Sequence, residues 1–425
     1  MSRRPGLLRH ADFRYLWASQ TISSVGTQVT VVAMPMLALV LLKTSPLQTT
    51  LLAAFEFLPF LLIGLPAGVW IDRLPIRPIL ITVDLGRALA LCLLPVAHWL
   101  GFLSLPLVYA AVFVVGGCTV FSDIGHQSML PALLDDDQVV EGNAKLQTSL
   151  SMSQLAGPTV GGFLVSLVSA PAAILADSVS YLFSAGFLSM IRTPETRAEQ
   201  PPGEPRSLRR EVGEGLWFVL GNPVLRALAI CTALANLAFG GVLAVIVMFG
   251  TRTLHLAPGL VGVAVAIGNA GGLLAAAACE PIRKRYGFGG LILVGVLVFN
   301  AGAWLLPLAN GLAGFGLALF ITFMGVMVYN IGQVSLRQIV TPRNLQGRMN
   351  ATMRFVMWGT IPLGAALAGV IADGPGIRDY LWTAAALNAT ALLPLLLTPR
   401  VLRKEPPTAP AAPAAQPDLA TEGAA

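Results

Sequence analysis

Charge is scarce in this chain: only 11% of its 425 residues are Asp, Glu, Lys or Arg, whereas 55% are hydrophobic. Water-soluble proteins carry charge on roughly a quarter of their residues. Together with a mean hydropathy of +0.74, this shortage excludes a water-soluble globular protein. The few charges separate apolar runs longer than about 18 residues, the length at which a helix crosses a bilayer. The lipid bilayer is therefore the expected environment of the chain.

Residues suited to catalysis or metal binding are also few. The four cysteines have no paired spacing and no histidines nearby, and the four histidines lie far apart, so neither a disulfide framework nor a zinc site is predicted. The sequence contains no Walker motif, no GxSxG turn and no HExxH motif, which are the signatures of common ATPases, hydrolases and metalloproteases. We expect no enzymatic activity, no cofactor and no metal. The net charge of +6 does not indicate a nucleic-acid partner, because the basic residues form no patch with aromatic residues.

The apolar runs predict twelve transmembrane helices. They cover residues 16–42, 48–71, 78–99, 104–127, 145–169, 172–191, 224–251, 259–282, 289–309, 312–335, 348–372 and 379–398. Lys and Arg crowd alternate connections, and only Lys43, Arg252 and Arg378 fall on the other side. Because retained positive charge sets orientation, both termini and the central segment are expected in the cytoplasm. The preference for Arg over Lys, with abundant Ala and Gly, indicates a GC-rich bacterium and hence its inner membrane.

A polar central segment divides the helices six and six. We expect an N-terminal six-helix bundle at 1–193, a cytoplasmic linker at 194–222, a C-terminal bundle at 223–399 and a disordered cytoplasmic tail at 400–425. Residues 207–220 of the linker are expected to form a helix in the membrane surface. A weak internal repeat, in which Gly157 matches Gly364 and Gly162 matches Gly369 at the same offset, fits parallel halves related by an axis along the membrane normal. Such repeats are typical of transporters that bind substrate between the halves.

The connection between the second and third runs reads GVWIDRLPIRP. It resembles the signature of the major facilitator superfamily at Gly68, Asp72, Arg73 and Arg77, although Pro75 stands where the family usually has Gly. The resemblance implies a conformational latch: Asp72 would face the start of the eleventh helix, and Arg77 would pair with Asp123, stabilising the outward-facing state. The alternative is that these are ordinary charges of a loop.

The fifth run contains Gly157, Pro158, Gly161 and Gly162, with Ser153 before them. It resembles the GPxxGG antiporter motif of exporters in the same superfamily, where a further glycine usually replaces the serine. Small residues at such an interface also serve simple packing. Over residues 10–398 the chain is similar to the drug:proton antiporter branch that includes bacterial macrolide-efflux and enterobactin-exporter proteins. The resemblance implies an all-α integral membrane protein with twelve transmembrane helices in two pseudo-symmetric six-helix bundles, the major facilitator fold.

Two carboxyl groups lie deep in the predicted spans, where a charge is costly and invites a functional explanation. Glu56 in the second span and Asp177 in the sixth are candidates for proton coupling, and the alternative for each is a hydrogen bond to a neighbouring helix. Thr27 stands where many relatives carry an aspartate in the first helix. Asp84 and Arg87 are one turn apart near the start of the third span and are expected to pair at the cytoplasmic edge.

Polar and aromatic side chains within the spans are candidates for a substrate cavity. Gln20, Ser24 and Thr27 form one polar stripe on the first span, which must face water or protein. The other candidates are Asn236, Asn330, Gln333, Tyr109 and Phe113. For each of them, packing or a hydrogen bond between helices is the alternative role.

These patterns predict a monomeric secondary transporter that exports a small amphipathic molecule in exchange for protons. Alternatives within transport are a siderophore or lysophospholipid carrier and a uniporter. The alternative of another class is a transport-dead membrane sensor or scaffold. Neither the substrate nor the proton stoichiometry follows from the residues.

Overall fold

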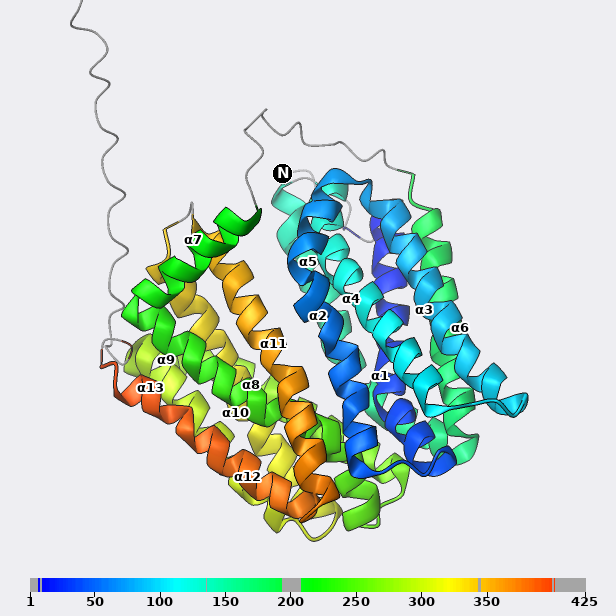
Figure 1. Cartoon of the computed structure of the whole chain (residues 1–425). Helices are drawn as coiled ribbons and strands as arrows, with labels where there is room; N and C mark the ends of the chain where they lie inside the picture. Colours follow the sequence, from blue (N-terminus) through cyan, green and yellow to red (C-terminus); the bar gives the residue numbers. More distant parts are fainter. Residues whose placement is uncertain are drawn as a thin grey trace, which may run out of the picture.

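The computed structural model describes residues 7, 10–134, 136–192, 208–342, 345–399 and 401. Within these residues the regular structure is helical and contains no strand. The helices form two groups that lie side by side (Figure 1). This arrangement agrees with the predicted helical bundles.

Six helices build the N-terminal half: α1 (Ala11–Leu41), α2 (Pro46–Arg73), α3 (Ile76–Trp99), α4 (Leu105–Leu133), α5 (Asp136–Leu167) and α6 (Ala170–Ser189). Their bounds follow the apolar runs closely, with two differences. The helix α4 continues past residue 127, and α5 begins at Asp136 instead of residue 145. Polar residues at these helix ends continue the helix beyond the apolar run, so hydropathy alone does not locate the ends.

The C-terminal half begins after α7 (Leu208–Gly221), which occupies the stretch expected to form a surface helix. Its elements are α8 (Pro223–Met248), the π-helix η2 (Phe249–Thr253), α9 (Pro258–Leu305), the 3₁₀-helix η3 (Leu306–Leu308), α10 (Leu312–Val340), α11 (Gln346–Asp373), α12 (Ile377–Thr390) and α13 (Leu392–Leu396). Trp217 of α7 is 80% exposed, as expected of a side chain that enters a membrane surface.

The long helix α9 contains a break at Gly287, where φ is 73° and ψ is −175°. A side chain at this positive φ would be strained, so glycine permits the turn. The two parts of α9 correspond to the predicted eighth and ninth spans. Arg283 and Lys284, close to the turn, pair with Glu280 at 2.6 and 3.7 Å.

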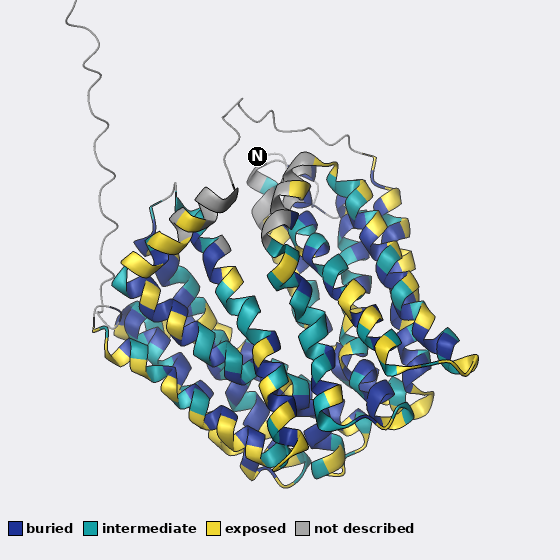
Figure 2. Ribbon diagram, in the orientation of Figure 1, coloured by how far each residue is buried: buried dark blue, intermediate teal, exposed yellow. Residues whose placement is uncertain are grey.

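Nine helices of the described chain are long and apolar enough to cross a membrane. One of the nine is α9, which counts as two spans because of its break. The helix α5 and the α12–α13 pair complete a set that is consistent with twelve. The polar inner half of α5, with Asn143, Lys145 and Gln147, explains its low hydropathy. Figure 2 shows exposed residues along the outer sides of the helices. Large apolar side chains are among the exposed residues of the chain, for example Leu89 (73% exposed) and Leu274 (64%), which suits contact with lipid.

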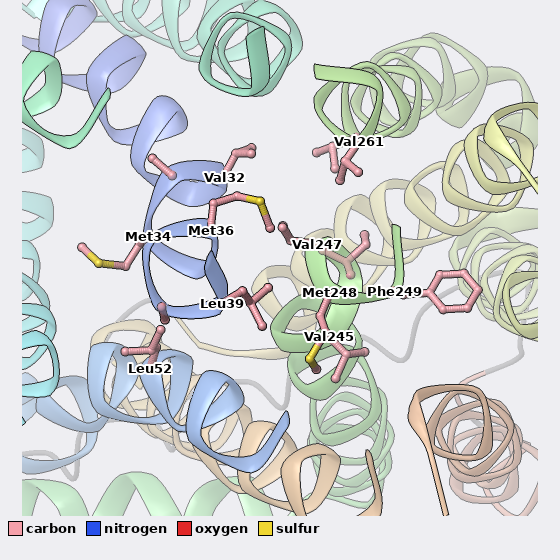
Figure 3. Close-up of a cluster of buried hydrophobic side chains, with 14 of the residues drawn as sticks. Val32, Met34, Met36, Leu39, Leu52, Val245, Val247, Met248, Phe249 and Val261 are labelled. Atoms are coloured by element: carbon pink, nitrogen blue, oxygen red, sulfur yellow. The ribbon is translucent and has the colours of Figure 1, made fainter. Parts of the chain in front are cut away.

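The two halves share one apolar cluster at the end of the molecule opposite α7. Figure 3 shows Val32 and Met36 of α1 facing Val247 and Met248 of α8 across this cluster. At the other end, each half has its own separate cluster. The protein is therefore sealed by hydrophobic packing at one end, while the halves are packed independently at the end that carries α7.

Two seams join the halves, α2 against α11 and α5 against the first part of α9. At the first seam Phe60 stacks on Trp358 with ring centroids 4.4 Å apart. On the sealed side, the Arg252 guanidinium donates to the Thr44 carbonyl oxygen at 3.0 Å. These contacts are the physical basis of the one-sided closure.

The orientation of the chain is testable by labelling single cysteines introduced into a variant without its own four cysteines. A cysteine at residue 285 should react with a membrane-impermeant maleimide from the cytoplasmic side, and a cysteine at residue 252 from the outside. Both native side chains, Arg285 and Arg252, are exposed, so access does not limit the reaction. Labelling of both positions from the same side would contradict the predicted topology.

Candidate functional site

A polar cavity of about 420 Å³ lies within the N-terminal half. Its walls come from α1, α3, α4, α5 and α6. They are formed by Gln20, Ser23, Ser24, Thr27, Gln28, Arg87, Thr119, Ser122, Asp123, His126, Asn143, Leu146, Gln147, Leu150 and Tyr181. The predicted stripe of Gln20, Ser24 and Thr27 thus lies on one wall. A cavity of this volume accommodates a drug-sized group.

A buried ion pair lies behind one wall of the cavity. The Arg87 Nη1 atom is 3.5 Å from Asp84 Oδ1, and the two side chains are 6% and 1% exposed. The Ser184 hydroxyl donates to Asp84 Oδ2 at 2.5 Å, and the Arg87 guanidinium lies 5.1 Å from the centre of the Tyr181 ring. The charge of Arg87 is therefore compensated by a carboxylate, a hydroxyl network and an aromatic face.

The pair of Asp84 and Arg87 forms as predicted, and it is buried. The helix α3 begins at Ile76, so Asp84 lies about 12 Å along it at about 1.5 Å per residue. Burial of these charges is tolerated because they pair with each other and Ser184 of α6 donates a hydrogen bond to Asp84. Asp84 is hydrogen-bonded to Ser184 of α6, and its partner Arg87 lines the cavity.

Asp123 and His126 lie on α4 and face the cavity. Asp123 is exposed there, and within the described part of the chain it makes no hydrogen bond or ion pair. It interacts electrostatically at longer range with Arg87, His126 and Arg354. His126 Nδ1 is 2.9 Å from the Ser122 carbonyl oxygen. Because that oxygen only accepts, Nδ1 donates in this contact. The buried Nε2 atom has no hydrogen-bond partner among the residues that the structure describes.

Asp177 lies outside the cavity, between α6 and α1. It is 1% exposed and accepts hydrogen bonds from the hydroxyls of Thr30 and Ser180, the latter at 3.1 Å. A Cβ atom at Gly26 would collide with its carboxylate, so this glycine admits the acid to the helix interface. The geometry favours the structural alternative for Asp177, a polar connection between α1 and α6.

Glu56 is half-buried on α2 and does not belong to the walls of the cavity described above. It has no hydrogen-bond or ion-pair partner among the residues that the structure describes. A Cβ atom at Gly116 would collide with the Glu56 carbonyl oxygen, so α2 and α4 approach each other closely here. The next residue, Phe57, contacts Trp358 of the other half at 5.8 Å between ring centroids. Glu56 therefore lies beside the seam between the halves.

The signature residues at the end of α2 are only partly visible. Gly68 and the side chains of Asp72 and Arg73 lie outside the described residues. Arg77 donates from Nε to the Leu188 carbonyl oxygen at 3.0 Å and from Nη2 to the Ser189 carbonyl oxygen. These carbonyls end α6, and an arginine satisfies them well. The described hydrogen bonds of Arg77 go to the end of α6, and no ion pair between Arg77 and Asp123 is present among the described residues.

The glycines of α5 permit backbone contact with neighbouring helices. A Cβ atom at Gly157 would collide with Gln28, one at Gly161 with Val29, and one at Gly162 with the Pro258 carbonyl oxygen. Across the seam, a Cβ at Gly262 would meet the Pro158 carbonyl oxygen. The predicted motif is thus part of the second seam between the halves.

The remaining candidates lie away from the cavity. Tyr109 stacks on Phe55 at 4.8 Å and donates to the Gln48 carbonyl oxygen at 2.8 Å, whereas Phe113 is 36% exposed. In the other half, the Asn236 amide donates to the Met357 carbonyl oxygen at 3.0 Å. Gln333 is fully buried and donates to Asn330 Oδ1 at 3.0 Å. These contacts match the alternative role of hydrogen bonding and packing within each half.

The sequence patterns do not identify several of the residues that line the cavity. His126 stands at the end of an expected apolar run, and Asn143 of α5 precedes the expected start of its span. Tyr181 of α6 lines the cavity but is not among the candidates from the sequence. A signal was available for Arg87 alone, since a charge inside an apolar run is costly.

Comparison with known proteins decides the family. The model of the transmembrane secretion effector family matches residues 5–422. The chain belongs to this family. It is therefore a major facilitator transporter, a multi-pass membrane protein that moves small molecules, and the resemblance predicted from the motifs is confirmed. Its family and its structural neighbours are transporters and not enzymes.

Three relatives are similar along most of their length. An uncharacterized MFS-type transporter of Sinorhizobium fredii is 28% identical, covering 87% of this chain and 89% of the relative. The multidrug efflux pump Tap of Mycolicibacterium fortuitum is 27% identical, with 85% and 89% covered. Macrolide efflux protein A of Streptococcus pyogenes is 23% identical, with 87% and 91% covered.

The fold is also that of solved transporters. A bacterial homologue of the human lysosomal transporter Spinster, in an inward-facing and unoccupied conformation, superposes with a TM-score of 0.69 at 16% identity. The match covers 94% of this chain and 98% of the other. The major facilitator fold predicted from the sequence is confirmed.

The seam of the transporter is testable at Gly162. Replacing Gly162 with Ala places a methyl group against Pro258 and Gly259, and overpacking costs about 1–3 kcal/mol. Such a cost shifts the equilibrium between the conformation with this seam closed and one with it open roughly 5- to 150-fold. A cysteine at residue 36, in the sealed cluster, should then be labelled at least fivefold faster from the outside, and transport should slow.

Gly186→Ala is the matched control, because a Cβ atom there meets nothing within 4 Å. It should leave labelling and transport unchanged. Equal behaviour of the Gly162 and Gly186 variants would show that the seam does not hold the halves together.

Proposed function

We propose that this transporter exports a small amphipathic molecule across the bacterial inner membrane in exchange for protons. The observation that carries the proposal is a polar cavity inside a bundle whose two halves share an apolar cluster at one end. With the predicted topology, the sealed end faces outward and the cavity loads from the cytoplasm. Rocking of the halves about the two seams would then release the substrate outside. The named efflux pumps among the relatives support export over uptake.

In this proposal Glu56 carries the exchanged proton. A carboxyl group held away from water and without a partner favours its protonated form, and contact with water allows its release. Glu56 is half-buried, lacks a partner in the described chain and lies beside the α2–α11 seam. Movement at that seam changes its access to water, which is what coupling of a proton to alternating access requires. Asp177 is the weaker candidate because its carboxylate already accepts two hydroxyl hydrogen bonds.

Everted membrane vesicles test both parts of the proposal. Vesicles that contain the protein and have an acidic lumen should concentrate ethidium, a small amphipathic dye, and vesicles without the protein should not. Collapse of the pH gradient should abolish the accumulation. Equilibration without concentration would indicate a uniporter, and no flux for any of a panel of amphiphiles and siderophores would favour the sensor or scaffold.

Glu56→Gln should remove uphill transport while leaving substrate binding and counterflow exchange intact, since glutamine mimics the protonated acid and cannot release a proton. Asp177→Asn is the companion variant: it should lower the unfolding temperature by weakening the α1–α6 contact, yet the folded protein should still respond to the gradient. A Glu56→Gln protein that concentrates ethidium in response to a pH gradient would overturn the assignment.

In this proposal Asp72 and Arg77 belong to a latch that stabilises the outward-facing state, in which the cavity is closed to the cytoplasm. Asp72→Asn and Arg77→Ala should each slow transport several-fold without weakening substrate binding to purified protein, because a latch changes the balance of states and not the cavity. Binding measured in detergent and flux measured in vesicles separate the two effects. Loss of binding by a folded variant would place the residue in the substrate site instead.

A further inference from the structure

A groove of about 360 Å³ lies on the surface of the C-terminal half, between the start of α8 and the α12–α13 pair. Large apolar side chains line it: Ile230 and Leu234 of α8, Leu393 of α13, and Leu397 directly after α13. Ile230 is 45% exposed, Leu393 54% and Leu397 80%. An open apolar groove on membrane-spanning helices suits a hydrocarbon chain, because burial of apolar surface is favourable.

One end of the groove carries a positive charge. Arg226 lines the groove and lies in the first turn of α8, which begins at Pro223. Arg226 is exposed, and it forms no ion pair with any residue that the structure describes. Its Nη1 atom donates to the Leu220 carbonyl oxygen at 3.2 Å. A guanidinium has five N–H donors, so others remain for the oxygens of a phosphate.

The charge and the apolar lining follow one another along α8. Leu234 lies eight residues after Arg226, about 12 Å further along the helix at about 1.5 Å per residue. The groove therefore matches a molecule that has an anionic head and a hydrocarbon chain. A soluble anion would leave the apolar part of the groove unfilled.

The charged end of the groove lies beside the helix expected at the membrane surface. The helix α7 ends at Gly221, two residues before α8 begins. Two of its apolar side chains, Leu216 and Trp217, are 45% and 80% exposed, as in a helix that lies in the headgroup region. With the predicted topology this surface faces the cytoplasm, where anionic lipids attract basic side chains.

We propose that this groove binds an anionic phospholipid, with its phosphate at Arg226 and an acyl chain along Ile230 and Leu393. The guanidinium selects the charged headgroup, and the apolar lining selects a lipid over a soluble phosphate. Because Arg226 also holds the end of α7 through the Leu220 carbonyl oxygen, the bound lipid links the central segment of the chain to the bilayer. This site is separate from the cavity of the N-terminal half.

Quenching by brominated lipids measures the lipid preference at the groove itself. The full-length protein without its own cysteines receives one cysteine at residue 397, which is labelled with bimane, and is reconstituted into phosphatidylcholine vesicles. Dibrominated phosphatidylglycerol and dibrominated phosphatidylcholine with the same chains are the two quenchers. Phosphatidylglycerol should bind at this position about fivefold more tightly, the effect of about one basic side chain on an anionic lipid.

Two pairs of variants in this labelled protein locate the preference. Arg226→Gln should abolish it, whereas Arg285→Gln, which removes the same charge from an exposed position outside the groove, should leave it unchanged. Ile230→Trp should also abolish the preference, because the larger side chain fills the groove while the charge stays. Its control is Leu243→Trp, at a 39% exposed position of the same helix outside the groove. Size-exclusion chromatography and the unfolding temperature establish that each variant is folded.

Three results would overturn the proposal. The first is equal binding of the two lipids next to residue 397, and the second is an Arg226→Gln protein that keeps the preference. The third is a preference that Ile230→Trp leaves intact, since this would mean that the charge attracts lipids to the surface without a bound lipid in the groove. None of these measurements depends on transport, so accumulation of ethidium by vesicles decides the proposed function separately.

Discussion

Backbone contact through glycine is the constraint on which this architecture depends. Helices buried in lipid gain little from hydrophobic association, since the lipid tails are as apolar as the side chains, so close packing must hold them together. At the sealed end Gly162 and Gly262 bring α5 and α9 together, and Gly369 admits Thr50 and Leu47 of α2 against α11. These contacts close one end of the molecule. At the end that carries α7, the described residues of the two halves pack in separate clusters.

Polar chemistry is concentrated in the N-terminal half. Within the membrane-spanning helices this half contains Glu56, Asp84, Arg87, Asp123 and Asp177. The acidic residues in the described spans of the C-terminal half, Glu280, Asp373 and Asp379, all lie near helix ends. The deep carboxylates, which are costly in lipid and therefore invite a functional explanation, thus belong to one half. The other half provides the surface against which it moves.

The sequence predicts the fold well because the bilayer imposes a strong and simple pattern. Apolar runs and charge asymmetry locate the helices, and Gly157 to Gly162 indicate a packed interface that the structure contains. The break at Gly287 and the early start of α5 are harder to predict, because a turn at positive φ and a polar helix end leave no mark in hydropathy. The stripe of Gln20, Ser24 and Thr27 can be predicted from the sequence because a polar face on an apolar membrane helix must face water or protein.

The rest of the site depends on contacts between distant segments. Nothing near Asp84 in the sequence announces that Ser184, one hundred residues later, donates to its carboxylate. In the same way, Arg87 of α3 and Asp123 of α4 line one cavity although they lie on different helices. Residue spacing identifies the pair of Asp84 and Arg87 but not its burial, and burial makes the pair part of the helix packing. In a membrane protein, therefore, the surroundings of a charge follow from contacts between helices and not from the spacing of residues along one helix.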